Sequence, residues 1–410
     1  MFSRLFAKHS PFKSTVYFHR SFASEPQKTC LHDLHVKNGG KMVNFAGFSM
    51  PVQYASDSII ASHLFTRSSC SLFDVSHMLQ LHIHGKDRVK FIEGLCVGDV
   101  EGLRDNSGTL SVFTNERGGI IDDFIVSKTS LGYLYVVSNA GCRDKDLALM
   151  NASLAVAKKN GLDVSIEVLE QRGLLAIQGP KMASVLQPHV DIALDQLLFM
   201  TTSVAAVCGI PNCRITRCGY TGEDGVEVSV PPESAEKVVS LLLQSSNGVL
   251  KLAGLGARDS LRLEAGLCLY GSDMNEEINP ITASLAWLVN KRRRSLADFP
   301  GASEILEELK TPSGQRRVGF ISRGPPARAH TQILSPDGKL IGEVTSGCPS
   351  PSLPGLNVAM GYVDRPFMKA GSDVVFNIRK NLIKAQVTKM PFVPTQYYIK
   401  KNNTSRNIKL

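Results

Sequence analysis

The chain has 410 residues and a mean hydropathy of −0.02, with 43% hydrophobic and 20% charged residues, which suits a globular protein of two or three domains. No apolar run approaches the roughly 20 residues of a membrane-spanning helix, so we expect no membrane association. The formal net charge of +9 suits an acidic partner, but basic and aromatic residues are not interleaved, which argues against nucleic acid. The densest basic cluster, Lys291 to Arg294, is interpreted as a solvated loop.

The first 24 residues differ from the rest, because they contain four basic residues and no acid precedes Glu25. This composition is typical of a mitochondrial transit peptide, and a disordered basic tail is the alternative. We therefore expect residues 1–24 to lie outside the fold and the protein to reside in the mitochondrial matrix. The nine cysteines include no Cys-x-x-Cys pair, which suits a reducing compartment and predicts no metal site.

From Thr109 to Asn139 the sequence predicts three antiparallel strands. TLSVFT, IIDDFIVS and YLYVVSN are rich in β-branched and aromatic residues, and the turns NERGG and TSLG between them contain glycine. A helical pattern follows from about Arg143 to Lys159.

A weak internal echo surrounds this region. Residues 79–92 read LQLHIHGKDRVKFI and residues 173–186 read GLLAIQGPKMASVL. Each segment predicts a strand that ends in Ile-x-Gly and a helix with an apolar pair six and seven residues after the glycine. Chance could produce this echo, but two related α+β subdomains would also produce it, and we favour the subdomains.

The C-terminal part of the chain has a different pattern of predicted elements. Two amphipathic helices are predicted at Glu233–Leu243 and Leu255–Leu267, followed by a candidate linker at Lys310–Gln315. Beyond the linker, short strand-like pieces are punctuated by glycine and proline, which predicts a small β-barrel. The expected organisation is a transit peptide (1–24), a region of two α+β subdomains (29–309), a barrel (310–398) and a frayed tail (399–410).

Residues 217–230, RCGYTGEDGVEVSV, combine a glycine-rich turn with three acids. Glycine-rich loops often bind anions through bare backbone N–H groups, but Glu223, Asp224 and Glu227 would repel an anion. The stretch therefore predicts a site that accepts hydrogen bonds from donors on a ligand.

The predicted strand IIDDFIV contains two adjacent acids, Asp122 and Asp123. Because side chains alternate along a strand, only one of these acids can face a pocket with its neighbours. A role as charged gatekeepers at a sheet edge is the alternative.

Six strings in this order resemble the T-protein of the glycine cleavage system, a tetrahydrofolate-dependent aminomethyltransferase. They are NERGGIIDDFIV, YLYVVSNAG, TRCGYTGEDGVEVSVP, GARDSLRLEAGLCLYGSDM, VTSGCPSPSL and MPFVPTQYY. The similarity extends from about Thr29 to Tyr398. It implies an α+β protein with a three-domain cloverleaf, in which two related subdomains precede a β-barrel and folate binds at the centre.

The resemblance implies roles for residues on the strands. Glu227 matches the carboxylate that accepts the amino group and ring N–H of the pterin, which leaves Glu223 and Asp224 as surface acids of the turn. Asp123 matches the catalytic aspartate, so Asp122 is expected to face away. Asn139 and Met78 match positions that line the folate pocket, and the neighbouring His77 is interpreted as structural.

Further ligand contacts are implied elsewhere. Arg258 matches a folate-binding arginine, whose planar fork suits a carboxylate, and Arg262 could be a surface ion-pair residue. Tyr397 matches a ligand-contacting tyrosine, and Arg317 is expected to close the pocket from the barrel side. Trp287 is expected either to pack against the cofactor or to fill a junction between domains.

The reaction that the resemblance implies needs no metal. A lipoyl-bearing H-protein delivers an aminomethyl group on sulfur, and tetrahydrofolate accepts the carbon as 5,10-methylenetetrahydrofolate, with release of ammonia and the dihydrolipoyl arm. The P- and L-proteins are the other components of the system. Asp123 would stabilise the iminium-like species or increase the nucleophilicity of the folate N10, and the sequence leaves both roles open.

Three rival interpretations were weighed. The folate domain of dimethylglycine or sarcosine dehydrogenases accompanies a flavin domain with a GxGxxG motif, which this chain lacks. A folate-binding iron–sulfur assembly protein of the same fold would carry Lys-Gly-Cys where this chain has Arg217-Cys218-Gly219. A basic nucleic-acid binder would show salt-dependent affinity without dependence on folate.

Overall fold

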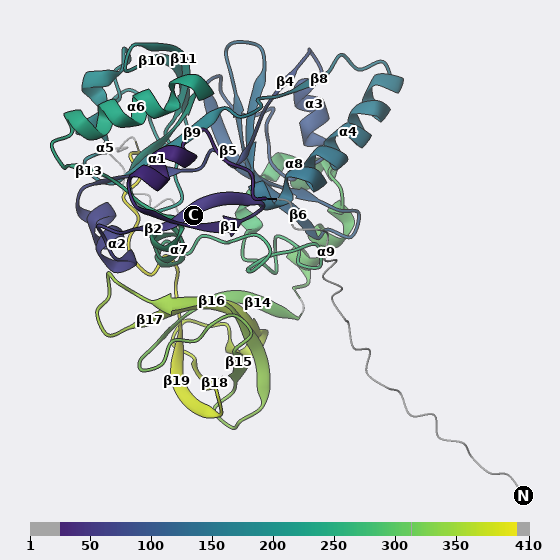
Figure 1. Cartoon of the computed structure of the whole chain (residues 1–410). Helices are drawn as coiled ribbons and strands as arrows, with labels where there is room; N and C mark the ends of the chain where they lie inside the picture. Colours follow the sequence, from purple (N-terminus) through teal and green to yellow (C-terminus); the bar gives the residue numbers. More distant parts are fainter. Residues whose placement is uncertain (1–24, 313, 400–410) are drawn as a thin grey trace, which may run out of the picture.

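The computed structural model of the protein describes residues 25–312 and 314–399, so the predicted transit peptide and most of the predicted tail lie outside the described residues. Two packed sheets form the upper part of the molecule in Figure 1, and a β-barrel lies below them. In the part of the chain that the structure describes, no helix has the length and apolar character required to cross a membrane.

The first sheet has the strand order β5-β6-β7-β4-β8. Its strands, with the helices between them, follow the chain as β4 (Leu79–His84), α3 (Arg88–Glu93), β5 (Ser107–Thr114), β6 (Ile120–Lys128), β7 (Leu134–Ser138), η1 (Ala140–Cys142), α4 (Arg143–Lys159) and β8 (Ser165–Val168). The three strands and the helix predicted between residues 109 and 159 are therefore confirmed.

The second sheet has the order β10-β11-β12-β9-β3-β13. Its chain order is β9 (Gly173–Gln178), α5 (Met182–Leu186), η2 (Gln187–His189), β10 (Thr202–Val207), β11 (Ile210–Thr216), β12 (Gly225–Val230), α6 (Pro232–Ser245) and β13 (Leu250–Leu252), and β3 (Cys70–Asp74) is inserted between β9 and β13. The first four strands repeat the order of the first sheet. The internal echo thus marks two related α+β units.

Each echo strand ends at a glycine that no other residue could replace without strain. Gly85 has φ +100° and Gly179 has φ +131°, which is the left-handed region that side chains avoid. A Cβ on Gly85 would lie 2.1 Å from the carbonyl oxygen of Asp163, and one on Gly179 would lie 2.3 Å from that of Ser69. Both glycines let the chain turn from strand to helix against neighbouring backbone.

The two sheets face each other, and helices cover their outer faces (Figure 1). Helices α5 and α6 pack on the second sheet through a buried apolar cluster, and α3 and α4 pack on the first sheet through another. A third cluster lies between the sheets and includes Phe73, Tyr135, Val137 and Leu174. The remaining elements before the barrel are α1 (His32–Lys37), β1 (Gly40–Phe45), β2 (Phe48–Tyr54), α2 (Ile59–Ser68), α7 (Leu255–Glu264), η3 (Ala286–Leu288), α8 (Lys291–Leu296) and α9 (Ala302–Lys310).

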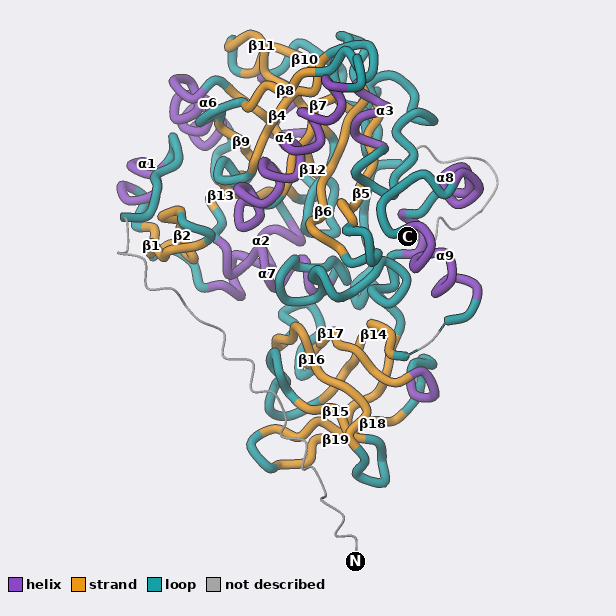
Figure 2. The backbone as a smooth tube through the Cα atoms, turned by 90° about the vertical axis from the view of Figure 1, so that its right-hand side faces the viewer, coloured by secondary structure: helices purple, strands orange, loops and turns teal. Residues whose placement is uncertain are grey.

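A closed barrel with the strand order β14-β17-β16-β15-β18-β19 follows and confirms the predicted fold class (Figure 2). Its elements are β14 (Gln315–Ser322), β15 (Gln332–Leu334), β16 (Leu340–Pro349), β17 (Asn357–Asp364), η4 (Arg365–Phe367), β18 (Asp373–Ile378) and β19 (Asn381–Thr388). Phe320 and Phe376 meet edge-on in its core at 5.4 Å. The exact domain boundaries stay a prediction.

The expectation of a solvated basic loop at Lys291–Arg294 is wrong. These residues begin helix α8, and the side chain of Arg293 is fully buried. Its guanidinium contacts Glu93 at 2.8 Å, and Arg292 forms ion pairs with Glu93 and Asp99. The two arginine side chains turn toward the protein because they pair with the carboxylates of Glu93 and Asp99. These partners are distant in the sequence, so the local pattern could not reveal them.

Candidate functional site

A narrow cavity lies between the facing sheets. The first sheet contributes Ile125, Ser127, Tyr135 and Val137, and the second sheet with its adjoining loop contributes Leu174, Thr216, Cys218 and Glu227. The lining is apolar except for a few polar groups that converge on the space, which is the usual character of a small-molecule site.

Two polar groups in this cavity have unused hydrogen-bonding capacity. Burial raises the pKa of Glu227, and the charge of Arg258 and a contact with the Cys218 thiol oppose that rise. The Ser127 hydroxyl is buried and has no hydrogen-bond partner among the described residues. A buried polar group without a partner is costly, and a carboxylate can accept more than the one thiol contact, so both groups fit a ligand that brings its own donors and acceptors.

Asp122 and Asp123 point to opposite faces of β6, as the alternation of strand side chains requires. Asp123 shares the inter-sheet face with Ser127, whereas Asp122 lies on the face covered by α4. Burial raises the pKa of Asp123 to about 7, and the neighbouring Asp122 carboxyl adds to the rise. An acid with such a pKa can exist in either protonation state near neutral pH.

Asn139 follows the last residue of β7 and contacts both acids. Its side-chain amide donates to Asp122 Oδ1 at 2.9 Å and to Asp123 Oδ1 at 2.8 Å. The structure therefore brings the predicted site residues Asp123 and Asn139 together with Asp122, which was expected to face away, in one acid cluster.

Arg258, on α7, packs against the ring of Tyr220, which also lies near Asp123. The Arg258 guanidinium is 4.7 Å from the centre of the Tyr220 ring, and the charges of Asp123 and Arg258 both act on the Tyr220 hydroxyl. The Nη1 atom of Arg258 is buried and has no partner within the described residues. A second small cavity reaches the same side chain and is also lined by Met50 and Asp74.

Tyr397 and Met78 lie at the edges of this region. The Tyr397 ring stacks on Phe199 with centroids 4.2 Å apart, and burial raises its pKa to about 12. Its segment is fixed by the N–H of Gln396, which donates to the carbonyl oxygen of Gly222 at 2.7 Å. Met78 packs against the apolar cluster between the sheets.

The expectation that Glu223 and Asp224 are surface acids is wrong for Glu223, which is buried, and incomplete for Asp224, which is held by a buried arginine. Arg67 Nη1 contacts Glu223 at 2.8 Å, and Arg217 forms a two-pronged pair with Asp224 at 2.9 and 2.6 Å. Arg217 belongs to the same stretch as Asp224, whereas Arg67 lies 156 residues before Glu223, beyond the reach of any turn pattern. The two acids hold the loop in place.

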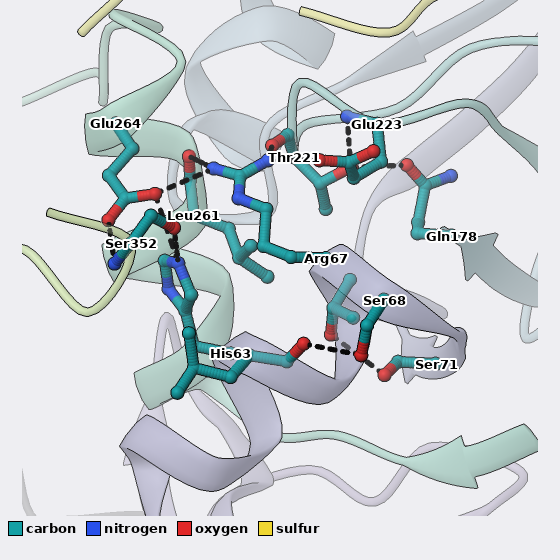
Figure 3. A network of polar contacts seen from close by, with 12 residues as sticks. His63, Arg67, Ser68, Ser71, Gln178, Thr221, Glu223, Leu261, Glu264 and Ser352 are labelled. Atoms are coloured by element: carbon teal, nitrogen blue, oxygen red, sulfur yellow. Dashed lines mark hydrogen bonds and ion pairs between the residues drawn. The ribbon is translucent and has the colours of Figure 1, made fainter. Parts of the chain in front are cut away.

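Figure 3 shows the buried network around Arg67. Arg67 Nη2 lies 3.0 Å from Glu264 Oε2, and the same oxygen lies 3.0 Å from His63 Nε2. The other oxygen of Glu264 accepts from the Ser352 N–H at 3.0 Å, which ties α7 to the barrel. Hydrogen bonds from His63, Ser350 and Ser352 hold the pKa of Glu264 at about 2 against its burial. The network joins α2, α7, the glycine-rich loop and the barrel.

Arg262 is not a surface residue, contrary to the expectation. It is buried and lies 2.7 Å from the fully buried Asp273, and it also donates to Ser346 Oγ at 2.9 Å. Asp273 in turn accepts from Thr345 of the barrel. Arg262 therefore anchors α7 to the barrel.

The structure does not bring Arg317 and Trp287 into the acid cluster. Arg317 is buried at the start of the barrel, where its Nε donates to the carbonyl oxygen of Ala283 at 2.8 Å. Trp287 lies on η3 and is 43% exposed. No contact in the described residues links either side chain to Glu227 or Asp123.

His77 is buried, and burial lowers its pKa to about 4, so it is neutral at physiological pH. Its ring packs edge-on against Phe45 at 5.6 Å, which favours the structural interpretation. In the described residues, His82, His84 and Glu167 place three potential metal ligands within 4.8 Å of one another. Glu167 is mostly exposed there and already contacts both imidazoles, so the predicted absence of a metal stays a prediction.

Sequence reasoning missed Ser127, Tyr135, Cys218 and Asp146. Ser127 could have been found by extending the alternation from Asp123, since it lies four residues further along the same strand. Asp146 looked like an ordinary acid in the first turn of a helix. Nothing local marked Tyr135 or Cys218.

The chain was compared with known proteins. Two family models match it: the GCVT N-terminal domain over residues 31–293 and the glycine cleavage T-protein C-terminal barrel domain over residues 315–394. The mitochondrial aminomethyltransferase of Mus musculus is 57% identical over 372 residues, and that of Homo sapiens is 56% identical, each over 91% of both chains. The crystal structure of the glycine cleavage system aminomethyltransferase T from Bartonella henselae superposes with a TM-score of 0.84 at 37% identity, over 91% of this chain and 99% of that one.

Proposed function

The chain belongs to the glycine cleavage T-protein family and is an aminomethyltransferase, and on this premise we propose that tetrahydrofolate binds between its two sheets. The one observation that carries the proposal is that the Glu227 carboxyl and the unpartnered Ser127 hydroxyl line one cavity between the sheets, with the unpartnered Arg258 Nη1 in the neighbouring cavity. The roles given to individual residues below are part of this proposal.

Glu227 receives the pterin. A carboxylate accepts the amino group and the ring N–H of a reduced pterin together, and such charge-assisted pairs are strong in a dry site. The Ser127 hydroxyl, without a partner in the described residues, supplies a further donor or acceptor to the ring. Arg258, with a free buried N–H in the described part of the chain, suits a carboxylate of the folate glutamate.

Asp123 acts on the one-carbon unit. The C–S bond and the C–N bond of the aminomethyl group both break, and two C–N bonds from the same carbon to folate form. The two protons released by the folate nitrogens end on ammonia and on the lipoyl sulfur. Because the pKa of Asp123 is raised to about 7, its ionised form can accept a folate proton and its protonated form can return it. The ionised form also stabilises the positive iminium-like species.

Asn139 orients the Asp123 carboxyl through its 2.8 Å hydrogen bond, and Tyr397 and Met78 close the apolar sides of the ligand site. In this proposal, Arg317 and the exposed Trp287 contact parts of the ligand that lie further from Asp123. The aminomethyl donor is the lipoyl-bearing H-protein, which works with the P- and L-proteins. The relatives are named mitochondrial, and we place this protein in the matrix, with residues 1–24 as its transit peptide.

The decisive experiment measures ammonia released from aminomethylated H-protein with and without tetrahydrofolate. We expect rapid release and 5,10-methylenetetrahydrofolate only when folate is present. The Glu227→Gln variant should need more folate, whereas Glu236→Gln, which changes an exposed acid on α6, should not. Equal release in the presence and absence of folate would refute the proposed function.

A further inference from the structure

Asn139 is held from one side by Asp122. Its backbone N–H donates to Asp122 Oδ2 at 3.1 Å and its side-chain amide donates to Asp122 Oδ1 at 2.9 Å. The same amide nitrogen lies 2.8 Å from Asp123 Oδ1. Since the amide has two hydrogens, the orientation that Asp122 imposes on one N–H fixes where the other points.

Behind Asp122 lies a third acid, Asp146, in the first turn of α4. The two carboxyls are in hydrogen-bonding contact, and both side chains are fully buried. Asp146 Oδ2 accepts from Ser138 Oγ at 2.6 Å, but Asp146 Oδ1 has no donor among the described residues. Two ionised carboxylates have no hydrogen to place between them, and burial disfavours two adjacent negative charges, so a proton must bridge the pair.

We propose that Asp122 and Asp146 share one proton at neutral pH, and that the neutral Asp122 is a positioning residue that orients Asn139 and leaves Asp123 as the ionised acid of the site. The sharing itself stands on the contact between Asp122 and Asp146 and on the hydrogen bonds of Asn139 to Asp122 and Asp123. Its consequence for turnover rests on the proposed function.

The surrounding charges agree with this assignment. Burial raises the pKa of both Asp122 and Asp146, while the charge of Lys145 favours the ionised form of Asp146. The other titratable groups that face the acids stay neutral, because burial raises the pKa of each: Cys142, Tyr220 and Cys268. Because a charged Asp122 would oppose ionisation of Asp123, the shared proton keeps the reacting acid available as an anion.

Two variants separate charge from geometry in the pH profile of turnover. Asp122→Asn keeps a neutral side chain but offers one acceptor oxygen in place of two, so it loses a bond to Asn139. We expect about a tenfold fall in kcat, as for one lost hydrogen bond, with an unchanged KM for folate. The acid limb of the pH profile, where turnover falls as the pH is lowered, should stay at the same pH. Asp146→Asn donates to Asp122 and lets it ionise, so the acid limb should move up by about one pH unit. An acid limb that moves down in Asp122→Asn would show that Asp122 is ionised and overturn the proposal.

Infrared spectroscopy tests the shared proton without any substrate. At pH 7 the difference spectrum between the wild-type protein and Asp122→Asn should contain the C=O stretch of a protonated buried carboxyl, and Asp123→Asn should retain this band. Circular dichroism of each variant checks the fold. A band that is absent from the wild type, or that Asp123→Asn alone removes, would overturn the proposal. If the band behaves as expected while ammonia release shows no folate dependence, the proposed function fails and the shared proton stands.

Discussion

The first four strands of the two sheets have the same order, yet the acids of the two sheets lie in opposite electrostatic environments. In the loop between β11 and β12 of the second sheet, Glu223 and Asp224 each contact an arginine. On β6 of the first sheet, Asp122 and Asp123 are joined by Asn139, and no hydrogen bond from an arginine or lysine reaches them in the described residues. An acid with a cationic partner remains charged and holds structure, whereas a buried acid without one can exchange a proton near neutral pH.

The largest effect should come from removing a cation from the paired acids. Arg67→Ala leaves Glu223 and Glu264 buried without their arginine, which should lower the free energy of unfolding by about 3–5 kcal/mol in urea denaturation. The matched control is Arg143→Ala, whose ion pair with Glu170 is solvent-exposed and should cost less than about 1 kcal/mol. Similar losses in both variants would remove the distinction between buried and exposed pairs.

The second effect concerns the acids that have no cationic partner. Asp123→Asn should preserve the fold and the dissociation constant of folate but lower kcat by on the order of 100-fold. The reason is that an amide neither carries the negative charge nor accepts a proton. Single-turnover ammonia release and folate calorimetry measure the two quantities separately. A rate within a factor of ten of wild type would mean that the reacting acid is a different residue.

The third effect concerns the one acid of the second sheet that faces the cavity. Glu227→Gln should weaken tetrahydrofolate binding by roughly 1–3 kcal/mol, because a charge-assisted fork becomes a mismatched neutral pair. Calorimetric titration measures this loss, with Glu236→Gln as the exposed control. Glu223→Gln is unsuitable as a control, because Glu223 is buried against Arg67. Unchanged affinity in Glu227→Gln would assign the pterin to other groups.

The smallest effect is a difference in how stability depends on pH. The pKa of Asp123 is raised from 3.8 to about 7, so this residue makes the wild-type protein lose stability as pH rises through this window, and Asp123→Asn lacks that contribution. Relative to wild type, the variant should gain about 1–2 kcal/mol between pH 6 and pH 8 in urea denaturation. Glu264 has the opposite sign: its pKa is lowered to about 2, so its contribution is complete above pH 4.5 and is lost only in acid. Glu264→Gln should therefore show the same deficit at pH 5 and pH 8.

Much of the fold was predictable because its signals are local. The helix at Arg143–Lys159 has the predicted bounds, and the glycine-terminated echo identified both sheets. The alternation in IIDDFIV correctly separated the faces of Asp122 and Asp123. What failed depends on distant partners. Glu223 and Arg67 are 156 residues apart in sequence, and no local pattern connects them.

The same limit applies to the acid cluster. Asp122 and Asp146 lie on different elements, and an acid in the first turn of a helix is ordinarily explained by the helix dipole. The role of Asn139 as a bridge between two carboxyls required its position at the end of β7, which only the strand register supplies. The sequence therefore indicated which residues matter, and the contacts indicated how they act together.

The segment Pro391–Tyr398 binds the chain end to the site: Phe392 donates to the carbonyl oxygen of Glu264, Gln396 to that of Gly222, and the carbonyl oxygen of Tyr398 accepts from Phe199. Ribosomes synthesise chains from the N-terminus, and domains fold in that order. Both sheets can thus fold while the end of the barrel and Tyr397 are still inside the ribosome. Since Tyr397 closes the proposed folate site, a nascent chain cannot complete it, and a messenger truncated by only twenty codons would yield a folded protein with an open site.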